Sequence, residues 1–454
     1  MSPSELSILR ETPIGAIATD WEMGVVADFV ASLQAGVSVN AIEVETGCGA
    51  NEIGVLKTSA VLQGRFFPEQ YKVVIPEDVA RVATSVVEDR VIISRMNTPA
   101  LVGESGYVAQ SHPNLFLPDR LWQTVPSKRP HSQRWLSYWL QHPIVRRLIS
   151  AAATGTSNSM KNISKESVLS LPVPRTPFVE QQRIVAVLTV LDNKLDVIAR
   201  QIEATRTLKR GLIQKLFSRG VGTQGADGRW VPHAEFKDSE LGEIPAGWSA
   251  EKLNSHVSKV GSGVTPKGGS DSYLSAGIPL IRSQNVLVGR LSLDDVVFIP
   301  PEQHEKMRNS ALVPNDVLLN ITGASIGRCA VLPADFDEGN VNQHVCIIRP
   351  AKSLNPYFLC HYLNSDIGQK QIGKFQAGGN REGLNYQQIR SFDVPVPPIS
   401  EQGEIAKFLG GVDKKIDVLI AKLEQYQTLK CGLMQKLLAG ECRLKLEHNE
   451  PVAA

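Results

Sequence analysis

The sequence predicts an α+β protein with two mixed α/β domains and two long helices, related by a pseudo-twofold internal repeat. Three observations support this fold class. The length of 454 residues leaves room for about three structural units of about 150 residues each. One segment of the chain recurs later in the sequence, and both copies have the heptad spacing of apolar residues that is typical of paired helices.

The composition is that of an ordinary globular protein, with 42% hydrophobic and 21% charged residues. The 48 Lys and Arg residues nearly balance the 46 Asp and Glu residues, and the net charge of +2 argues against a purely electrostatic, histone-like nucleic-acid binder. The six cysteines form no C-x-x-C pair, no apolar run is long enough to span a membrane, and the N-terminus lacks a signal-peptide pattern. We therefore expect a cytoplasmic protein without a membrane segment.

The strongest internal match joins residues 180–216 to residues 401–437, without gaps and with nearly half of the positions identical. Weaker matches join the preceding regions, where Gly36 corresponds to Gly263 and Trp21 to Trp248. We therefore expect the same order of elements in both halves of the chain. The expected boundaries are a first domain at 1–175, a first long helix at 176–220, a linker at 221–240, a second domain at 241–397, a second long helix at 398–440 and a C-terminal tail at 441–454.

Each domain is predicted to mix strands and short helices. Strand-like runs such as residues 91–93 and 317–319 are separated by turn signals, without regular βαβ alternation. The segment between the first helix and the second domain is rich in Gly and polar residues, as linkers are.

The two repeated segments are predicted to be helices that pair as an antiparallel coiled coil. Each begins after a proline, Pro177 or Pro398, and ends near a glycine, Gly220 or Gly440. The alternative is two core helices in separate domains. Apolar residues at a 4-3-4-3-4 spacing form the expected pairing seam: Ile184, Leu188, Leu191, Leu195, Ile198 and Ile202 in the first helix, and Ile405, Leu409, Val412, Ile416, Leu419 and Leu423 in the second.

Gly211 and Gly432 occupy matching positions inside these helices. Glycine costs about 1 kcal/mol relative to Ala inside a helix. Its presence in both copies predicts that another backbone approaches closely there.

Polar loops in the two domains are the candidate DNA-reading segments. Asn, Gln, Arg, Lys, Ser and Thr are the residue types that contact base edges and phosphates, although any single one is also an ordinary turn residue. These loops differ between the two halves, as two different specificities would require. The candidates are Ser38, Lys57, Ser59, Arg95, Asn97, Thr156 and Asn158 in the first domain, and Thr265, Lys267, Arg282, Gln284, Asn320, Thr322, Ser325, Gln343, His344, Asn380 and Arg381 in the second.

Three motifs that resemble catalytic sites are incomplete. Residues 263–270 nearly match a P-loop, but Gly269 stands where the lysine is required. Residues 355–358 resemble the N-P-P-[YF] loop of amino-methyltransferases without its second proline, and we instead expect Asn355 to cap a helix. Asp227, Glu235 and Lys237 loosely resemble a nuclease metal site, but they lie in the expected linker. We therefore predict a chain without catalytic residues, bound metal or bound cofactor.

Several sequence features together resemble the DNA-specificity subunit of type I restriction-modification systems. They are residues 241–248 (L-G-E-I-P-x-G-W), residues 395–402 (P-x-P-P-x-x-E-Q) and residues 433–438 (L-M-Q-K-L-L), within a duplicated chain. The resemblance covers nearly the whole chain. It is weaker in the first domain, where Ala18 replaces Pro245 and residues 176–179 depart from the proline pattern.

The resemblance implies that each domain reads one half of an asymmetric, split site in double-stranded DNA, while the helix pair sets the unread spacer. It also implies two methyltransferase subunits that bring S-adenosylmethionine, and motor-nuclease subunits that bring ATP and Mg²⁺. Glu180-Gln181 and Glu401-Gln402 would begin the helices, and residues 214–216 and 435–437 would end them.

Two other functions are consistent with parts of the sequence. One is a two-domain scaffold that binds proteins, which would show no salt-sensitive DNA binding. The other is a self-sufficient methyltransferase or nuclease, which the incomplete motifs disfavour.

Overall fold

The computed structural model describes residues 8–43, 52–157, 160–266, 268–376 and 383–443. The chain divides into two compact units. Unit 1 contains residues 1–198 and 422–454, and unit 2 contains residues 199–421. Each unit therefore combines one domain with part of each long helix.

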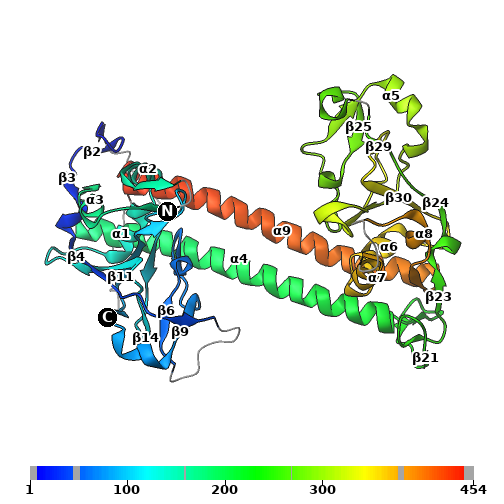
Figure 1. Ribbon diagram of the computed structural model, residues 1–454, viewed down its shortest axis with the longest axis horizontal. Helices are drawn as coiled ribbons and strands as arrows, with labels where there is room; N and C mark the ends of the chain where they lie inside the picture. The colour runs from blue at the N-terminus through cyan, green and yellow to red at the C-terminus, as the bar shows by residue number, and fades with distance from the viewer. Residues whose placement is uncertain (1–7, 44–51, 158–159, 267, 377–382, 444–454) are drawn as a thin grey trace. The chain divides into compact units, whose positions relative to one another are not determined.

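The long helices are α4 (Phe178–Arg219) and α9 (Ile399–Leu438), visible in Figure 1 as the two longest ribbons. Each is followed by a glycine in the left-handed backbone region, Gly220 with φ 68° and Gly440 with φ 70°. All twelve residues of the predicted seam are buried or half-buried. Neither long helix, nor any other helix among the described residues, has the length and hydropathy that a membrane span needs.

Unit 1 contains strands in two larger sheets and several small ones. The six-stranded sheet has the order β4 (Val30–Ala35), β15 (Leu121–Pro126), β11 (Arg90–Ser94), β13 (Ser105–Val108), β8 (Gly64–Phe66) and β7 (Val61–Leu62). The five-stranded sheet has the order β10 (Ser85–Val86), β14 (His112–Phe116), β6 (Gly54–Leu56), β9 (Tyr71–Val74) and β5 (Ala41–Ile42). The small sheets are β12 (Met96–Asn97) with β17 (Met160–Asn162) and β16 (Thr154–Ser157), β18 (Pro172–Pro174) with β3 (Met23–Val25), and β1 (Leu9–Arg10) with β2 (Ile17–Ala18).

Three short α-helices complete the part of unit 1 that the structure describes: α1 (Gln133–Leu140), α2 (Pro143–Ala152) and α3 (Lys165–Leu169). Trp135 and Trp139 of α1 are almost fully buried in one core with Leu188 of α4 and Leu437 of α9. The first part of α4 and the last part of α9 therefore contribute to the same hydrophobic core.

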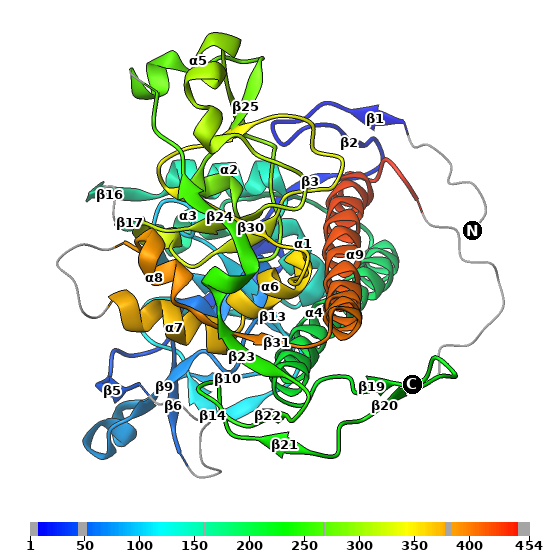
Figure 2. The ribbon, with the colours of Figure 1, turned by 90° about the vertical axis from the view of Figure 1, so that its right-hand side faces the viewer.

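Unit 2 has a four-stranded sheet and a three-stranded sheet. The first has the order β24 (Val257–Ser262), β30 (Val345–Pro350), β27 (Val317–Asn320) and β28 (Cys329–Val331), and β24 lies beside β30 in Figure 2. The second has the order β26 (Val297–Ile299), β25 (Ile278–Ile281) and β29 (Asn340–Val341). The remaining strand pairs are β23 (Ser249–Lys252) with β31 (Asp393–Val396), β19 (Thr223–Gln224) with β20 (Trp230–Val231), and β21 (Phe236–Lys237) with β22 (Ile244–Pro245).

The short helices of unit 2 are α5 (Pro301–Lys306), α6 (Pro356–Leu363), α7 (Asp366–Gln376) and α8 (Tyr386–Arg390). Asn355 caps α6, as expected, because its side chain accepts hydrogen bonds from the backbone N–H groups of Tyr357 and Phe358. Phe358 and Tyr362 of α6 pack on Phe217 of α4, at ring-centroid distances of 5.2 and 5.4 Å.

A buried glutamine near the start of each long helix ties that helix to its domain. Gln181 accepts a hydrogen bond from the Ser132 backbone N–H at the start of α1 (2.8 Å), and Gln402 accepts one from the Asn355 backbone N–H at the start of α6 (2.8 Å). The glutamines occupy matching positions of the sequence repeat. Each unit therefore positions a domain helix with the same side chain.

Each glycine that follows a long helix packs against a tryptophan of the domain. A Cβ atom on Gly440 would lie 3.0 Å from the Trp21 ring, and one on Gly220 would lie 2.8 Å from the Trp248 ring.

The expected close approach of another backbone at Gly211 and Gly432 is wrong for this chain, because a Cβ at either position would meet no atom within 4 Å.

Candidate nucleic-acid interface

In unit 2, the candidate interface centres on the turn from Asn342 to His344, which connects β29 to β30. Its backbone is held on several sides: the Gly263 N–H donates to the Asn342 carbonyl (3.2 Å), and the Ile321 N–H donates to the His344 carbonyl (3.0 Å). The Asn342 side chain accepts from the His344 N–H at 3.0 Å. Gln343 lies exposed at the tip of this fixed turn.

Three sequence-predicted side chains meet at this turn. His344 Nδ1 lies 2.6 Å from Thr322 Oγ1, and the Gln343 amide nitrogen lies 3.2 Å from His344 Nε2. Thr322 follows β27, so two loops that are far apart in sequence form one polar cluster. This cluster could contact a base edge or a phosphate.

Nearby segments extend this polar edge. Thr322 forms a bridge with Gly383, and the Tyr386 hydroxyl lies 2.5 Å from the Ser262 hydroxyl at the end of β24. A Cβ on Gly263 would lie 1.6 Å from the Val341 carbonyl oxygen, so this crossing requires glycine.

Unit 1 has a comparable turn with different side chains. Residues 118–120 precede β15, and the Arg95 N–H donates to the Arg120 carbonyl at 3.0 Å, just as Ile321 does to His344 in unit 2. A Cβ on Gly36 would lie 1.6 Å from the Leu117 carbonyl oxygen, matching the crossing at Gly263. Here, however, the turn presents Asp119 and exposed Arg120. Sequence reasoning missed both residues, although the matched glycines were a signal that could have located them.

Basic and polar residues gather around the unit 1 turn. Arg95 and Lys165 each have their charged group 5.9 Å from the Trp122 ring centroid. Asn97 lies in β12, which pairs with β17, and β17 in turn pairs with the strand that contains Thr156. The structure therefore places the predicted residues Asn97 and Thr156 on one small sheet, and Arg95 directly before its strand β12.

Other predicted residues are engaged inside their own domains. Lys57 forms an ion pair with Glu43 (2.6 Å), and the Ser59 hydroxyl donates to Gln70 (3.0 Å). The Gln284 amide donates to Asp295.

Arg282 donates to the Asp295 carbonyl (2.8 Å). Asn320 is fully buried, and its amide donates to the Ser283 carbonyl at 2.8 Å. Asn320 therefore positions the neighbouring turn.

The remaining predicted residues lie in loops or in a short 3-10 helix, or outside the described residues. Ser38 is exposed, and its carbonyl accepts from Arg81; Thr265 follows β24; Ser325 ends a short 3-10 helix. Four candidates lie outside the described residues: Asn158, Lys267, Asn380 and Arg381.

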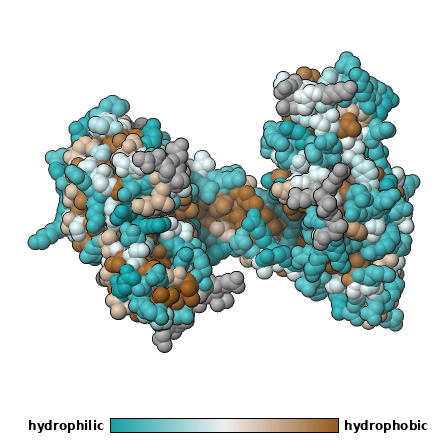
Figure 3. Space-filling view, in the orientation of Figure 1, coloured by the Kyte–Doolittle hydropathy of each residue, from teal (hydrophilic) through white to brown (hydrophobic). Residues whose placement is uncertain are grey.

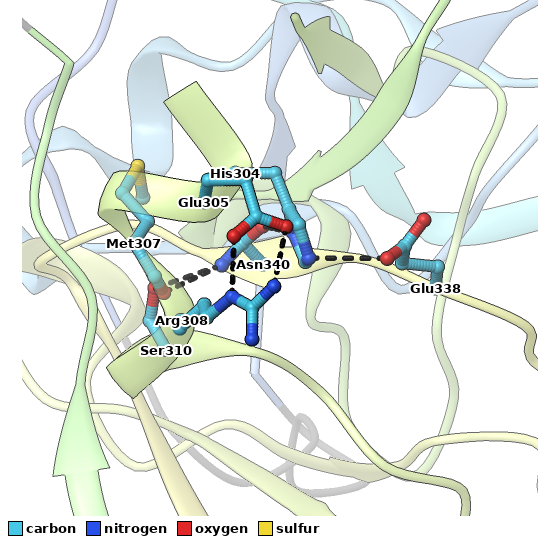
Figure 4. A network of polar contacts seen from close by, with 7 residues as sticks. All are labelled: His304, Glu305, Met307, Arg308, Ser310, Glu338 and Asn340. Carbon is cyan, nitrogen blue, oxygen red and sulfur yellow. Dashed lines mark hydrogen bonds and ion pairs between the residues drawn. The ribbon is translucent and has the colours of Figure 1, made fainter. Parts of the chain in front are cut away.

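A second polar network in unit 2 is internal (Figure 4). The His304 ring of α5 contacts Asn340 Oδ1 at 2.6 Å and the Glu338 carboxylate at 3.0 Å. The Asn340 amide donates to the carbonyl of Met307 at 2.9 Å. This network anchors α5 to β29. Across the described part of the chain, no group of three or more His, Cys, Asp or Glu side chains is arranged to hold a metal ion.

Comparison with known proteins adds to this geometry. Residues 257–426 match the family model of the type I restriction modification DNA specificity domain. A relative from Methanocaldococcus jannaschii, named for the MjaX specificity subunit, is 25% identical over 439 residues, which cover 96% of this chain and 97% of the relative. The chain is therefore similar to specificity subunits of type I restriction-modification systems over nearly its whole length.

Other specificity subunits match over parts or all of the chain. The MjaVIII specificity subunit of M. jannaschii is 28% identical over 289 residues, or 63% of this chain and 65% of the relative. A solved specificity subunit from M. genitalium has a TM-score of 0.57 and 18% identity, and the match covers 94% of this chain and 98% of that chain. This last likeness shows that the two chains share a fold.

Proposed function

We propose that this chain is a DNA-specificity subunit and that it reads a split DNA site, one half with each unit. The observation that carries the proposal is the shared turn: the same backbone crossing at Gly36 and Gly263 presents Asp119 and Arg120 in unit 1 but Gln343 and His344 in unit 2. A common frame with different hydrogen-bonding groups suits two readers of different base sequences. DNA as the target also implies a cytoplasmic location.

The proposal includes an antiparallel coiled coil of α4 and α9 that fixes the unread spacer. Lys430 of α9 pairs with Asp192 of α4 at 2.6 Å in unit 1, and Lys209 of α4 pairs with Asp413 of α9 at 2.5 Å in unit 2. In the sequence repeat Asp192 corresponds to Asp413 and Lys209 to Lys430, so the two ion pairs are equivalent with the helices exchanged. A pseudo-twofold helix pair requires this equivalence. Helices of about 40 residues extend about 60 Å, so the pair is long enough to separate two binding edges.

We further propose that partner subunits supply all of the chemistry: two methyltransferase subunits with S-adenosylmethionine, and motor-nuclease subunits with ATP and Mg²⁺. Apolar surface on the long helices supports docking, and Figure 3 shows it in brown. Val190, Leu208 and Val418 are 67%, 57% and 62% exposed. The open space around Gly211 and Gly432 would let a partner backbone approach.

Methylation mapping of the host genome, with and without this gene, tests the proposal. One asymmetric split motif should lose its methylation on deletion. Exchange of residues 1–175 for another such domain should change one half-site and leave the other unchanged. A complex with its methyltransferase subunits that shows no salt-dependent DNA binding would instead favour the protein-binding scaffold.

A further inference from the structure

We propose that Gln343 reads an adenine in the half-site of unit 2, and that His344 and Thr322 are positioning residues that orient its amide. The inference rests on the proposed DNA-reading function and assigns a base and an atom-level role to one turn.

The hydrogen bonds around His344 determine which atoms donate. An amide nitrogen only donates, so Gln343 Nε2 donates to His344 Nε2 across 3.2 Å. His344 Nε2 must then carry a lone pair, and the ring proton lies on Nδ1. Nδ1 donates to Thr322 Oγ1 across 2.6 Å. The three side chains thus form one directed relay.

The relay leaves hydrogen-bonding capacity at its exposed end. Among the described residues, the structure records no partner for the Gln343 amide oxygen or for its second amide proton. An adenine edge in the major groove offers the N6 amino group as donor and N7 as acceptor. A glutamine amide complements this pair in a bidentate contact, whereas guanine offers two acceptors there.

The Gln343 side chain is partly ordered before DNA binds, and this favours the contact with adenine. A free glutamine side chain loses considerable rotamer freedom when it is fixed. Here His344 already restrains the amide, and the turn itself is held by Gly263 and Ile321. Part of the ordering therefore precedes DNA binding.

The other described amide candidates of unit 2 are already engaged. Gln284 donates to Asp295, and Asn320 is buried against the Ser283 carbonyl. Among these three amide candidates, Gln343 is therefore the exposed one whose oxygen has no partner within the described chain.

The test uses the full chain expressed with its methyltransferase subunits in a host without other adenine methylation. The methylated motif is read from genomic DNA and from a duplex library with randomised half-sites. Gln343→Ala should lower discrimination at one adenine of one half-site by about 5- to 150-fold. Gln343→Glu should shift the preference toward cytosine, whose N4 group donates to a carboxylate.

Two sets of variants separate reading from folding. His344→Ala and Thr322→Val should weaken discrimination at the same base by a smaller factor, without changing which base is preferred. Gln303→Ala, in α5 of the same unit, is the matched control and should leave the motif unchanged.

An unchanged motif in Gln343→Ala, beside a clear wild-type motif, would overturn the inference but not the proposed function. A change in the half-site that depends on residues 1–175 would also overturn it. A wild-type complex without any motif would overturn the proposed function itself.

Discussion

Replacement of Tyr138 by Phe tests how α1 is anchored to α4 within unit 1. The Tyr138 hydroxyl donates to Asp192 Oδ2 at 2.5 Å, while Lys430 pairs with Oδ1 of the same carboxylate. Burial, reinforced by the Asp192 charge, raises the pKa of Tyr138 to about 12, so the hydroxyl remains a donor at neutral pH. The substitution removes this bond and keeps the aromatic ring beside Lys430, whose ammonium lies 5.5 Å from the ring centroid.

A hydrogen bond to a charged partner contributes about 1.5–3 kcal/mol. Asp192 is 22% exposed, so we expect about 2 kcal/mol for Tyr138→Phe. Tyr107→Phe is the control: its hydroxyl donates to exposed Asp89 at 3.2 Å, and we expect at most about 1 kcal/mol.

Hydrogen–deuterium exchange of α1 is the appropriate assay, because a chain with two units need not unfold in one step. Protection of α1 should fall about 30-fold in Tyr138→Phe, and protection of α6 in unit 2 should stay constant. Equal effects of Tyr138→Phe and Tyr107→Phe on α1 would refute the assigned role of the Asp192 contact.

Three further predictions follow from other contacts. Burial lowers the pKa of His361 to about 4, so below about pH 6.5 the unfolded chain binds a proton that the folded chain excludes. The free energy of unfolding should therefore fall by about 1.4 kcal/mol per pH unit as the pH drops from 6.5 to 4. Melting curves of His361→Phe should lack this contribution. Glu401 accepts from Trp248 Nε1 (2.8 Å) and from the N–H groups of Val221 and Gly222, so Glu401→Gln should cost about 2 kcal/mol or more by calorimetry. The control is Glu180→Gln, whose carboxylate lies 3.5 Å from Arg443 and whose loss should cost under about 1 kcal/mol; equal losses would contradict this account. Arg120→Ala should relax a guanine in the half-site that depends on residues 1–175, and a methylation motif that keeps this guanine would argue against base contact by Arg120.

Features that depend on local sequence were predicted well. The helix bounds follow from the heptad spacing between Pro177 and Gly220, and between Pro398 and Gly440, because helix periodicity and end signals act within a few residues. Asn355 as a helix cap was also evident from its position before Pro356.

The candidate site was only partly predictable. Residue type placed Gln343, Gln284 and Asn320 in one class, but strand pairing leaves Gln343 exposed, engages Gln284 with Asp295 and buries Asn320. Asp119 and Arg120 escaped notice because the repeat is weak around them. Their significance becomes clear only when their turn is compared with the turn of Gln343 and His344, which has the same backbone hydrogen bonding.

The sequence by itself determined two long helices with apolar seams, two related domains and a resemblance to one family, because these depend on short-range periodicity and on repetition. Tertiary structure alone decided which polar side chains point outward from a shared turn, and which carboxylates meet Tyr138 or Lys209. Such contacts join residues far apart in the chain. Exposure and hydrogen-bond partners are set by how strands and helices pack, which no local pattern specifies.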